Sequence, residues 1–401
     1  MKFKKAVSIA LMAAMTMTLF AGCGADGGQK SADGTGSANG TESAASGDAF
    51  RIGGIGPVTG EAAVYGVAVK NGAELAVKEI NEAGGIGGKQ IEFNFQDDEH
   101  DAEKAVNAYN TLKDWGTQAI LGTVTSGPCV AVGQVSNEDN IFLLTPSGTA
   151  VDCVKYPNAF RVCFSDPMQG LESAKYIGEN NLAEKVAVIY DSSDVYSSGI
   201  YEAFAKEAEN QNFEIVAAEA FTAESNKDFS VQLQKAKDAE ADLVFLPFYY
   251  SQASLVLKQA AGMSYSPAFF GCDGMDGILA VKGFDAALAD NLIFLSPFTP
   301  TSEDEAIQKF VTDYKEAYGE TPNQFAADAY DGIYAIKAAM EKAGVTPDMS
   351  ASDICEALKP AMLEVTIDGV TAKSLTWEES GEPSKEPMVV KIANGDYAVV
   401  E

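Results

Sequence analysis

Short apolar runs alternate with longer amphipathic segments along most of the chain. The run at 50–56, FRIGGIG, ends in glycine, and an apolar-periodic stretch at 62–80 and a second strand pattern in GGIGGKQIEFNFQDD follow it. The alternation continues with helical patterns at 102–115 and 130–139, each followed by a strand pattern, QAILGTV before the second helix and IFLLTP after it. Strands that alternate with helices predict a parallel sheet with right-handed crossovers.

A second series of strand patterns begins after residue 160. Its apolar runs are KVAVIYD (185–191), FEIVAAEAF (213–221), ADLVFLPF (241–248), SPAFFG (266–271) and DNLIFLSPF (290–298). Between the two series, residues 156–170 contain Pro and Asp-Pro, which break regular structure and suit a crossing segment. A helical stretch from Pro322 to Ala343 and strand patterns at 386–400 supply return crossings. The pattern predicts an α/β protein with two doubly wound parallel-sheet lobes joined by a multi-strand hinge.

The N-terminal residues have the pattern of an export signal. Three lysines precede an apolar run at 6–20, which is shorter than the roughly 20 residues of a spanning helix. The FAGC that follows resembles the bacterial lipobox, in which the cysteine, here Cys23, receives lipid, although Phe20 replaces the usual Leu. We expect a signal peptide at 1–22 and a protein that is extracytoplasmic and lipid-anchored to the outer face of a bacterial cell membrane. An ordinary secretory signal is the alternative.

The chain length and a polar tether set the expected domains. The stretch before residue 50 offers no large apolar side chain to a core, so 23–49 is expected to be the lipid anchor and a flexible linker. The remaining residues, about 350, exceed what one core usually supports. We expect an N-terminal lobe at 50–160, completed by about 299–345, and a C-terminal lobe at 161–298, completed by about 346–401.

Charge and cysteine content exclude several classes of function. The chain has 58 acidic and 28 basic residues, a formal charge of −30, and lacks the basic face that nucleic acids require. Its cysteines after Cys23 show no C-x-x-C spacing, which argues against a zinc site. In an exported protein, Cys129, Cys153 and Cys163 could supply one disulfide, and free thiols are the alternative. No metal or cofactor is expected.

Motifs of enzyme chemistry are weak. GGIGPVTG and GGIGGK lack the spacing of phosphate-binding loops, so their glycines are interpreted as turn residues. His100, the single histidine, lies in DDEHDAE between a strand and a helix, where capping of the helix by Asp101 or a neighbour is the favoured reading. A Ser-His-Asp triad would have to use this same His100, and no G-x-S-x-G motif is present. The sequence therefore favours binding over catalysis.

Hydroxyl, aromatic and acidic side chains follow five of the expected strands. Ligands bind at the carboxyl ends of strands in open α/β sheets, because the loops there converge. Each residue alone also fits a turn, a cap or an exposed aromatic. The residues that follow these strands are Thr125 and Ser126 in TVTSG, Ser147, Gly148 and Thr149 in LLTPSGTA, Tyr196 in SSDVYSSG, Tyr249 in PFYYS and Asp273 in GCDG.

Several of these motifs, in this order, resemble the Leu/Ile/Val-binding-protein group, the periplasmic-type substrate-binding proteins of ABC importers. The similarity runs from Phe50 to about Tyr334 and includes IGGIGPVTGEAAVYG, NGAELAVKEINEAGGIGGKQIEF, TSGP, TPSGTA, SDPMQG, VIYDSSDVYSSG and FFGCDG. The resemblance implies the type I periplasmic binding protein fold, with two lobes that close on a ligand. It also implies a monomer that captures a neutral, branched-chain amino acid and delivers it to an ABC permease.

The resemblance also implies roles for individual residues. Ser126 and Thr149 match the positions that hold the ligand carboxylate, whereas Ser147, Thr149 and Asp273 match those that meet the ammonium. Aromatic residues at Tyr65, Tyr196 and Tyr249 would close over the ligand, and Thr125 and Gly148 complete the expected ligand-binding set.

Two departures leave the ligand open. The acid is often Glu in this group but is Asp273 here, and a disulfide of some members would fall at His100 and Thr125. A short amide, urea or a small peptide on the same fold, a ligand sensor and a secreted enzyme remain alternatives.

Overall fold

The computed structural model describes residues 48–400. The expected signal peptide, the expected lipid site Cys23 and nearly all of the expected tether lie outside the described residues. No helix within 48–400 is long and apolar enough to cross a membrane.

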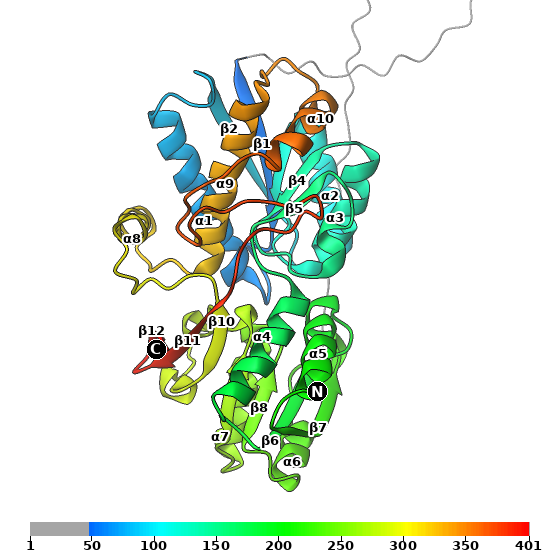
Figure 1. Ribbon diagram of the computed structural model, residues 1–401, viewed down its shortest axis with the longest axis vertical. Helices are drawn as coiled ribbons and strands as arrows, with labels where there is room; N and C mark the ends of the chain where they lie inside the picture. The colour runs from blue at the N-terminus through cyan, green and yellow to red at the C-terminus, as the bar shows by residue number, and fades with distance from the viewer. Residues whose placement is uncertain (1–47, 401) are drawn as a thin grey trace, which may run out of the picture. The chain divides into compact units, whose positions relative to one another are not determined.

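The first lobe is built on a five-stranded parallel sheet of order β2-β1-β3-β4-β5 (Figure 1). Strands β3 and β4 are buried along their whole length, as expected for strands with helices on both faces. Helix α9 returns late in the chain and packs along α1, beside which Figure 1 draws it. The elements are β1 (Ala49–Gly56), α1 (Ala63–Glu82), β2 (Gln90–Asp97), α2 (Ala102–Trp115), β3 (Ala119–Gly122), α3 (Ser126–Glu138), β4 (Phe142–Thr145), η1 (Val151–Val154), β5 (Ala159–Arg161), α8 (Glu305–Tyr318), α9 (Gln324–Ala343) and α10 (Ala351–Met362).

The second lobe is built on a seven-stranded sheet of order β12-β11-β10-β9-β8-β6-β7. Strands β6 to β10 are parallel to one another, and β11 and β12 add an antiparallel edge next to β10. The elements are α4 (Asp166–Glu179), β6 (Lys185–Asp191), α5 (Val195–Ala208), β7 (Glu214–Phe221), η2 (Ala223–Ser225), α6 (Ser230–Asp238), β8 (Leu243–Leu246), α7 (Tyr250–Gly262), β9 (Ala268–Gly271), η3 (Asp273–Met275), η4 (Ile278–Ala280), η5 (Ala286–Ala289), β10 (Ile293–Ser296), β11 (Met388–Ala393) and β12 (Asp396–Val399).

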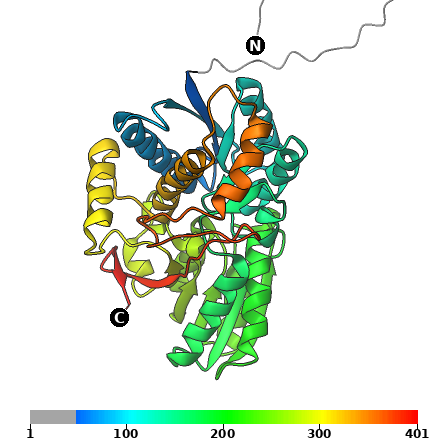
Figure 2. The ribbon, with the colours of Figure 1, turned by 45° about the horizontal axis from the view of Figure 1, so that its top comes forward.

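Three segments of chain connect the two sheets. Residues 162–165 lead from β5 to α4, 297–304 lead from β10 to α8, and 363–387 lead from α10 to β11. Figure 2 shows the last of these as the orange-to-red segment that runs across to the red C-terminal strands. The predicted fold class, two α/β lobes joined by several connections, is confirmed.

The structure differs from the sequence expectations in two places. The crossing expected at 156–170 contains strand β5, whose three residues follow Pro157 too closely to give a strand pattern. Residues 346–401 were expected to complete the second lobe, but α10 contacts α9, β3 and β4 of the first. The apolar stripe of α10, including Ile354 and Leu358, is buried there.

Candidate ligand site

The start of helix α3 forms one wall of a cavity between the lobes. Thr125 is the N-cap residue, and its side chain makes no capping hydrogen bond. Instead, its hydroxyl lies 2.8 Å from Nδ1 of His100. The N–H groups of the first helical turn have no intrahelical partners, and they carry the positive end of the helix dipole. This wall therefore suits an anion.

The loop after β4 lies against the start of α3. The Ser126 hydroxyl accepts a hydrogen bond from the Ala150 N–H at 3.2 Å and lies 3.4 Å from the Thr149 hydroxyl. Ser147 donates its hydroxyl hydrogen to the carbonyl of Val124 at 2.7 Å. These bonds join the ends of β3 and β4 and bring two hydroxyls, those of Ser126 and Thr149, to the anion-binding wall.

Asp273 and two tyrosines form the opposite wall, on the second lobe. The Tyr196 hydroxyl donates to the Asp273 carboxylate at 2.6 Å and accepts from the Gly274 N–H at 3.0 Å. The ring of Tyr249 stacks on Tyr196 with centroids 4.8 Å apart. Asp273 is only 4% exposed, and burial raises its pKa to about 6, although the bond from Tyr196 opposes that shift. A cation in the cavity would stabilise the ionised carboxylate.

The two lobes are in contact around this cavity. Tyr65 of the first lobe donates its hydroxyl hydrogen to the Gly274 carbonyl at 2.5 Å and accepts from the Tyr250 N–H at 3.2 Å. In return, the Val64 N–H donates to the Tyr250 hydroxyl at 3.3 Å. These bonds exist only when the lobes are together, so the structure represents a closed form.

The cavity is narrow in this closed form and leaves room for about one water molecule. It brings together eight of the nine predicted ligand-binding residues, all except Gly148. The lining residues are Tyr65, Val124, Thr125, Ser126, Ser147, Thr149, Tyr196, Tyr249, Asp273, Gly274 and Phe325. Gly148 lies behind the cavity, where a Cβ would come within 2.9 Å of the Cys129 sulfur. The structure therefore explains a glycine at position 148 by its close packing against Cys129, and Gly148 does not line the cavity.

One residue of the cavity lining and one residue bonded to it were not predicted from the sequence. Phe325 reaches it from the first turn of α9, and its ring lies 4.2 Å from that of Tyr65. Asp166, at the start of α4, is a second buried acid, and its N–H donates to the Thr149 carbonyl at 2.9 Å. Burial raises the pKa of Asp166 well above its usual range. The Asp-Pro in SDPMQG was a signal for Asp166, but Phe325 gave none, because nothing in the sequence shows that α9 returns to the cleft.

Unpaired polar atoms belong to one residue of the cavity lining and to two residues that are hydrogen-bonded to the lining. Within the part of the chain that the structure describes, Asp166 Oδ1, Gln169 Nε2 and the Tyr249 hydroxyl are buried without a hydrogen-bond partner. Buried polar groups are normally paired, so these atoms indicate a place for a polar ligand or its water.

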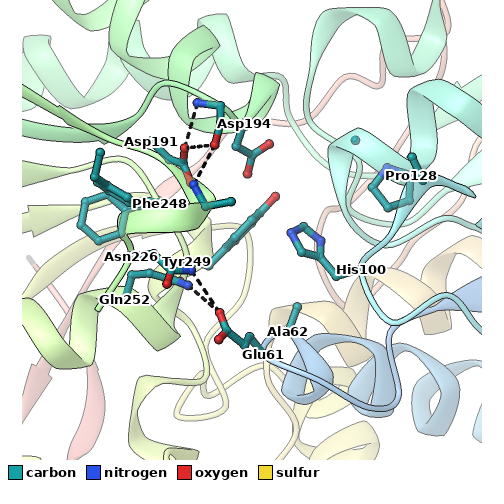
Figure 3. A pocket seen from close by; sticks show the side chains of 15 residues that line it. Glu61, Ala62, His100, Pro128, Asp191, Asp194, Asn226, Phe248, Tyr249 and Gln252 are labelled. Atoms are coloured by element: carbon teal, nitrogen blue, oxygen red, sulfur yellow. Dashed lines mark hydrogen bonds between the residues drawn. The ribbon is translucent and has the colours of Figure 1, made fainter. Parts of the chain in front are cut away.

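A larger pocket of about 300 Å³ lies outside the cavity, and Tyr249 lines both. Figure 3 shows Tyr249 beside His100, with Glu61 bonded to residues of the second lobe. The ring centroids of Tyr249 and His100 are 5.3 Å apart, and Gln252 donates to the Glu61 carboxylate at 3.0 Å. Tyr249 therefore separates the small cavity from an acidic entrance that Asp191 and Asp194 also line.

The structure also decides two smaller predictions, those of the helix cap and of the disulfide. Asp101 caps α2 by accepting from the Lys104 N–H at 2.9 Å, so the capping interpretation of the DDEHDAE stretch is confirmed. The predicted disulfide is not formed, because Cys129, Cys153 and Cys163 are free, buried thiols. Across residues 48–400, no group of three or more His, Cys, Asp or Glu side chains is placed to hold a metal ion.

Comparison with known proteins identifies the family. The family model described as periplasmic binding protein matches residues 49–396. The chain belongs to the periplasmic binding protein family. Within this family it is similar to the Leu/Ile/Val-binding protein BraC3 of Rhizobium johnstonii, with 31% identity over 82% of this chain and 88% of the relative. A binding protein for leucine, isoleucine, valine, threonine and alanine from Pseudomonas aeruginosa is 28% identical over 88% of this chain and 90% of its own. The resemblance to the Leu/Ile/Val-binding group is confirmed.

Solved structures of periplasmic binding proteins agree with this assignment. The branched-chain amino acid transporter substrate-binding protein LivJ of Streptococcus pneumoniae, in complex with isoleucine, matches with a TM-score of 0.80 and 31% identity. That match covers 88% of this chain and 99% of LivJ. A solute-binding protein of R. palustris in complex with benzoate matches with a TM-score of 0.78 over 88% of this chain and 95% of its own, at 21% identity. This second likeness concerns the fold alone, which evidently holds ligands of different chemistry.

Proposed function

We propose that this protein is an extracytoplasmic substrate-binding protein that captures a neutral, branched-chain amino acid and delivers it to an ABC import permease. The observation that carries the proposal is the division of charge across the cavity. One lobe offers a helix N-terminus with the hydroxyls of Ser126 and Thr149, and the other offers the buried carboxylate of Asp273. An α-amino acid carries one anionic and one cationic group a few bonds apart, which is the pattern that these walls complement.

The size and lining of the cavity favour a small, partly apolar ligand. In this closed form the two walls leave room for about one water molecule between them, so a small ligand requires less opening of the lobes than a large one. A branched-chain amino acid meets this condition better than a peptide. Tyr65, Tyr249 and Phe325 supply an apolar surface for its side chain. The names of the relatives, which bind leucine, isoleucine and valine, agree with this choice.

Capture is proposed to occur by closure of the lobes. The carboxylate of the ligand first meets Ser126, Thr149 and the α3 N-terminus, and the ammonium meets Asp273 when the second lobe approaches. Contacts with both walls exist only in the closed form, so the ligand shifts the equilibrium toward closure. The bonds of Tyr65 to Gly274 and Tyr250 form in the same step.

Calorimetric titration of the protein with the twenty amino acids, urea and small amides tests this function. Leucine, isoleucine or valine is expected to bind and to raise the melting temperature, since a ligand of the native state stabilises it by mass action. A short amide or urea as the best ligand would favour the alternative of the same fold with another substrate. Binding of none of these compounds would refute the proposal.

Membrane attachment is proposed to depend on Cys23. The FAGC motif and the polar stretch that follows support a signal peptide at 1–22, a lipid anchor with a linker at 23–49, and attachment through lipid alone. Mass spectrometry of membrane-extracted protein should find acyl groups on Cys23, and a Cys23→Ala variant should be released from the membrane. Unchanged membrane association of that variant would contradict the proposal.

A further inference from the structure

The guanidinium of Arg161 lies directly behind the loop that carries Ser147 and Thr149. Arg161 is the last residue of β5, and its side chain is fully buried. The guanidinium donates to four successive carbonyls: Gly148 at 3.0 Å, Thr149, Ala150 at 2.9 Å and Val151 at 3.5 Å. Hydrogen bonds from a charged donor are about twice as strong as neutral ones, so this group fixes the curvature of the loop.

That curvature places the two hydroxyls of the anion-binding wall. Because the carbonyls of residues 148–151 turn toward Arg161, the N–H groups of the loop face the other way. The Ala150 N–H meets the Ser126 hydroxyl, which in turn lies 3.4 Å from the Thr149 hydroxyl. Arg161 itself does not line the cavity. Its effect on a ligand carboxylate passes through Ser126 and Thr149.

The segment that returns to the second lobe holds Arg161 from the other side. The Arg161 N–H donates to the Gly381 carbonyl at 3.0 Å, and the Trp377 indole N–H donates to the Arg161 carbonyl at 2.7 Å. Glu382, which is half-buried, pairs with the guanidinium at 3.2 Å. Arg161 thus joins three parts of the chain: the β4 loop, the first crossing segment, which begins at residue 162, and the third, which contains 377–382.

We propose that Arg161 is a positioning residue, through which the crossing segment at 377–382 sets the geometry of the carboxylate-binding wall. The inference rests on the proposed function, because it concerns the wall that receives the ligand carboxylate. It predicts that changes at Arg161 or Glu382 weaken recognition of the carboxylate more than recognition of the rest of the ligand. A merely structural role would weaken both alike.

The test compares two probes, L-leucine and L-leucinamide. The second keeps the α-ammonium group and the side chain but replaces the carboxylate with a neutral amide. Calorimetry and competition would give the ratio of their affinities for the wild type, Arg161→Lys and Glu382→Gln, with the melting temperature of each. Lysine keeps the charge but, as a compact point donor, cannot reach four carbonyls. Glu379→Gln is the matched control, because Glu379 is exposed in the same turn and its substitution makes the same change in charge.

The preference for L-leucine over L-leucinamide is expected to fall about tenfold or more in Arg161→Lys, the equivalent of one lost charge-assisted bond. In Glu382→Gln it is expected to fall roughly two- to fivefold, because a half-exposed ion pair contributes little. Glu379→Gln should behave as the wild type. If Arg161→Lys fails to fold, Glu382→Gln alone decides.

An unchanged preference in the folded variants would overturn the inference and leave the proposed function intact. Binding of neither probe to the wild type, together with failure of the wider amino-acid screen, would overturn both.

Discussion

Replacement of Asp273 by Asn tests the ammonium site with a minimal change in shape. Burial raises the pKa of this carboxyl from 3.8 to about 6. Keeping it ionised at pH 7 in the empty cavity therefore costs about 3 kcal/mol, at 1.36 kcal/mol for each pH unit. A ligand ammonium offsets that cost, whereas loss of one partner of such a buried charge pair typically costs about 2–5 kcal/mol. The affinity for L-leucine should fall at least about 30-fold.

The stability of the Asp273→Asn variant should not fall with its affinity. Asn keeps an oxygen that can accept from the Tyr196 hydroxyl, and it removes the cost of a buried charge. Calorimetry at pH 7 gives the affinity, and the melting temperature checks the fold. Asp276→Asn is the matched control, since Asp276 is also a buried acid but binds Gln324 and Tyr397 outside the cavity. Wild-type affinity in a well-folded Asp273→Asn variant would refute the ammonium role and leave Asp273 as a residue of the turn.

Three further predictions concern pH, closure and the hinge. Because ammonium binding needs the ionised carboxylate, the affinity for L-leucine should be highest above pH 6, the approximate pKa of Asp273. Below that pH the affinity should fall, and binding should release a proton from Asp273. An affinity that stays constant from pH 5 to pH 8 would contradict this. Tyr65→Phe removes both cross-lobe bonds of the hydroxyl, so calorimetry should show affinity lower by about fivefold to tenfold with an unchanged melting temperature without ligand. Lys385→Met leaves the buried carboxylate of Asp328 without its ion-pair partner, and urea unfolding at pH 7 should show a loss of about 3–5 kcal/mol, against less than 1 kcal/mol for the surface-pair control Lys337→Met.

The lobes and most of the ligand cavity could be predicted because they follow local rules. Strand and helix periodicity gave the two sheets, and the polar residues after β3, β4 and β9 marked the carboxyl ends where loops converge. Gly148 lies in the same loop as Ser147 and Thr149, but it packs against Cys129 instead of facing the cavity. Loop position alone does not give the direction in which a residue faces.

The contributions that sequence reasoning missed come from long-range packing. Phe325 and α10 reach the first lobe only because the chain crosses back after β10, and no local pattern fixes which sheet a late amphipathic helix will cover. Arg161 has the sequence context of an ordinary polar residue, and its role becomes visible only when the neighbouring carbonyls are in place. Propensity and periodicity depend on residues that are close in the sequence, whereas the positions of these side chains depend on contacts with residues that are far away in the sequence.

The late return of α9 to the cavity also has a consequence for the order of folding. The wall residues span the chain from Tyr65 to Phe325, and the loop behind them is held by residues as late as Glu382. Domains generally fold as units from the N-terminus as the chain emerges. A partly emerged chain that has completed both parallel sheets up to β10 still lacks one side of its ligand cavity. The amino acid therefore cannot bind to early folding intermediates, and it stabilises only a chain that is almost completely folded.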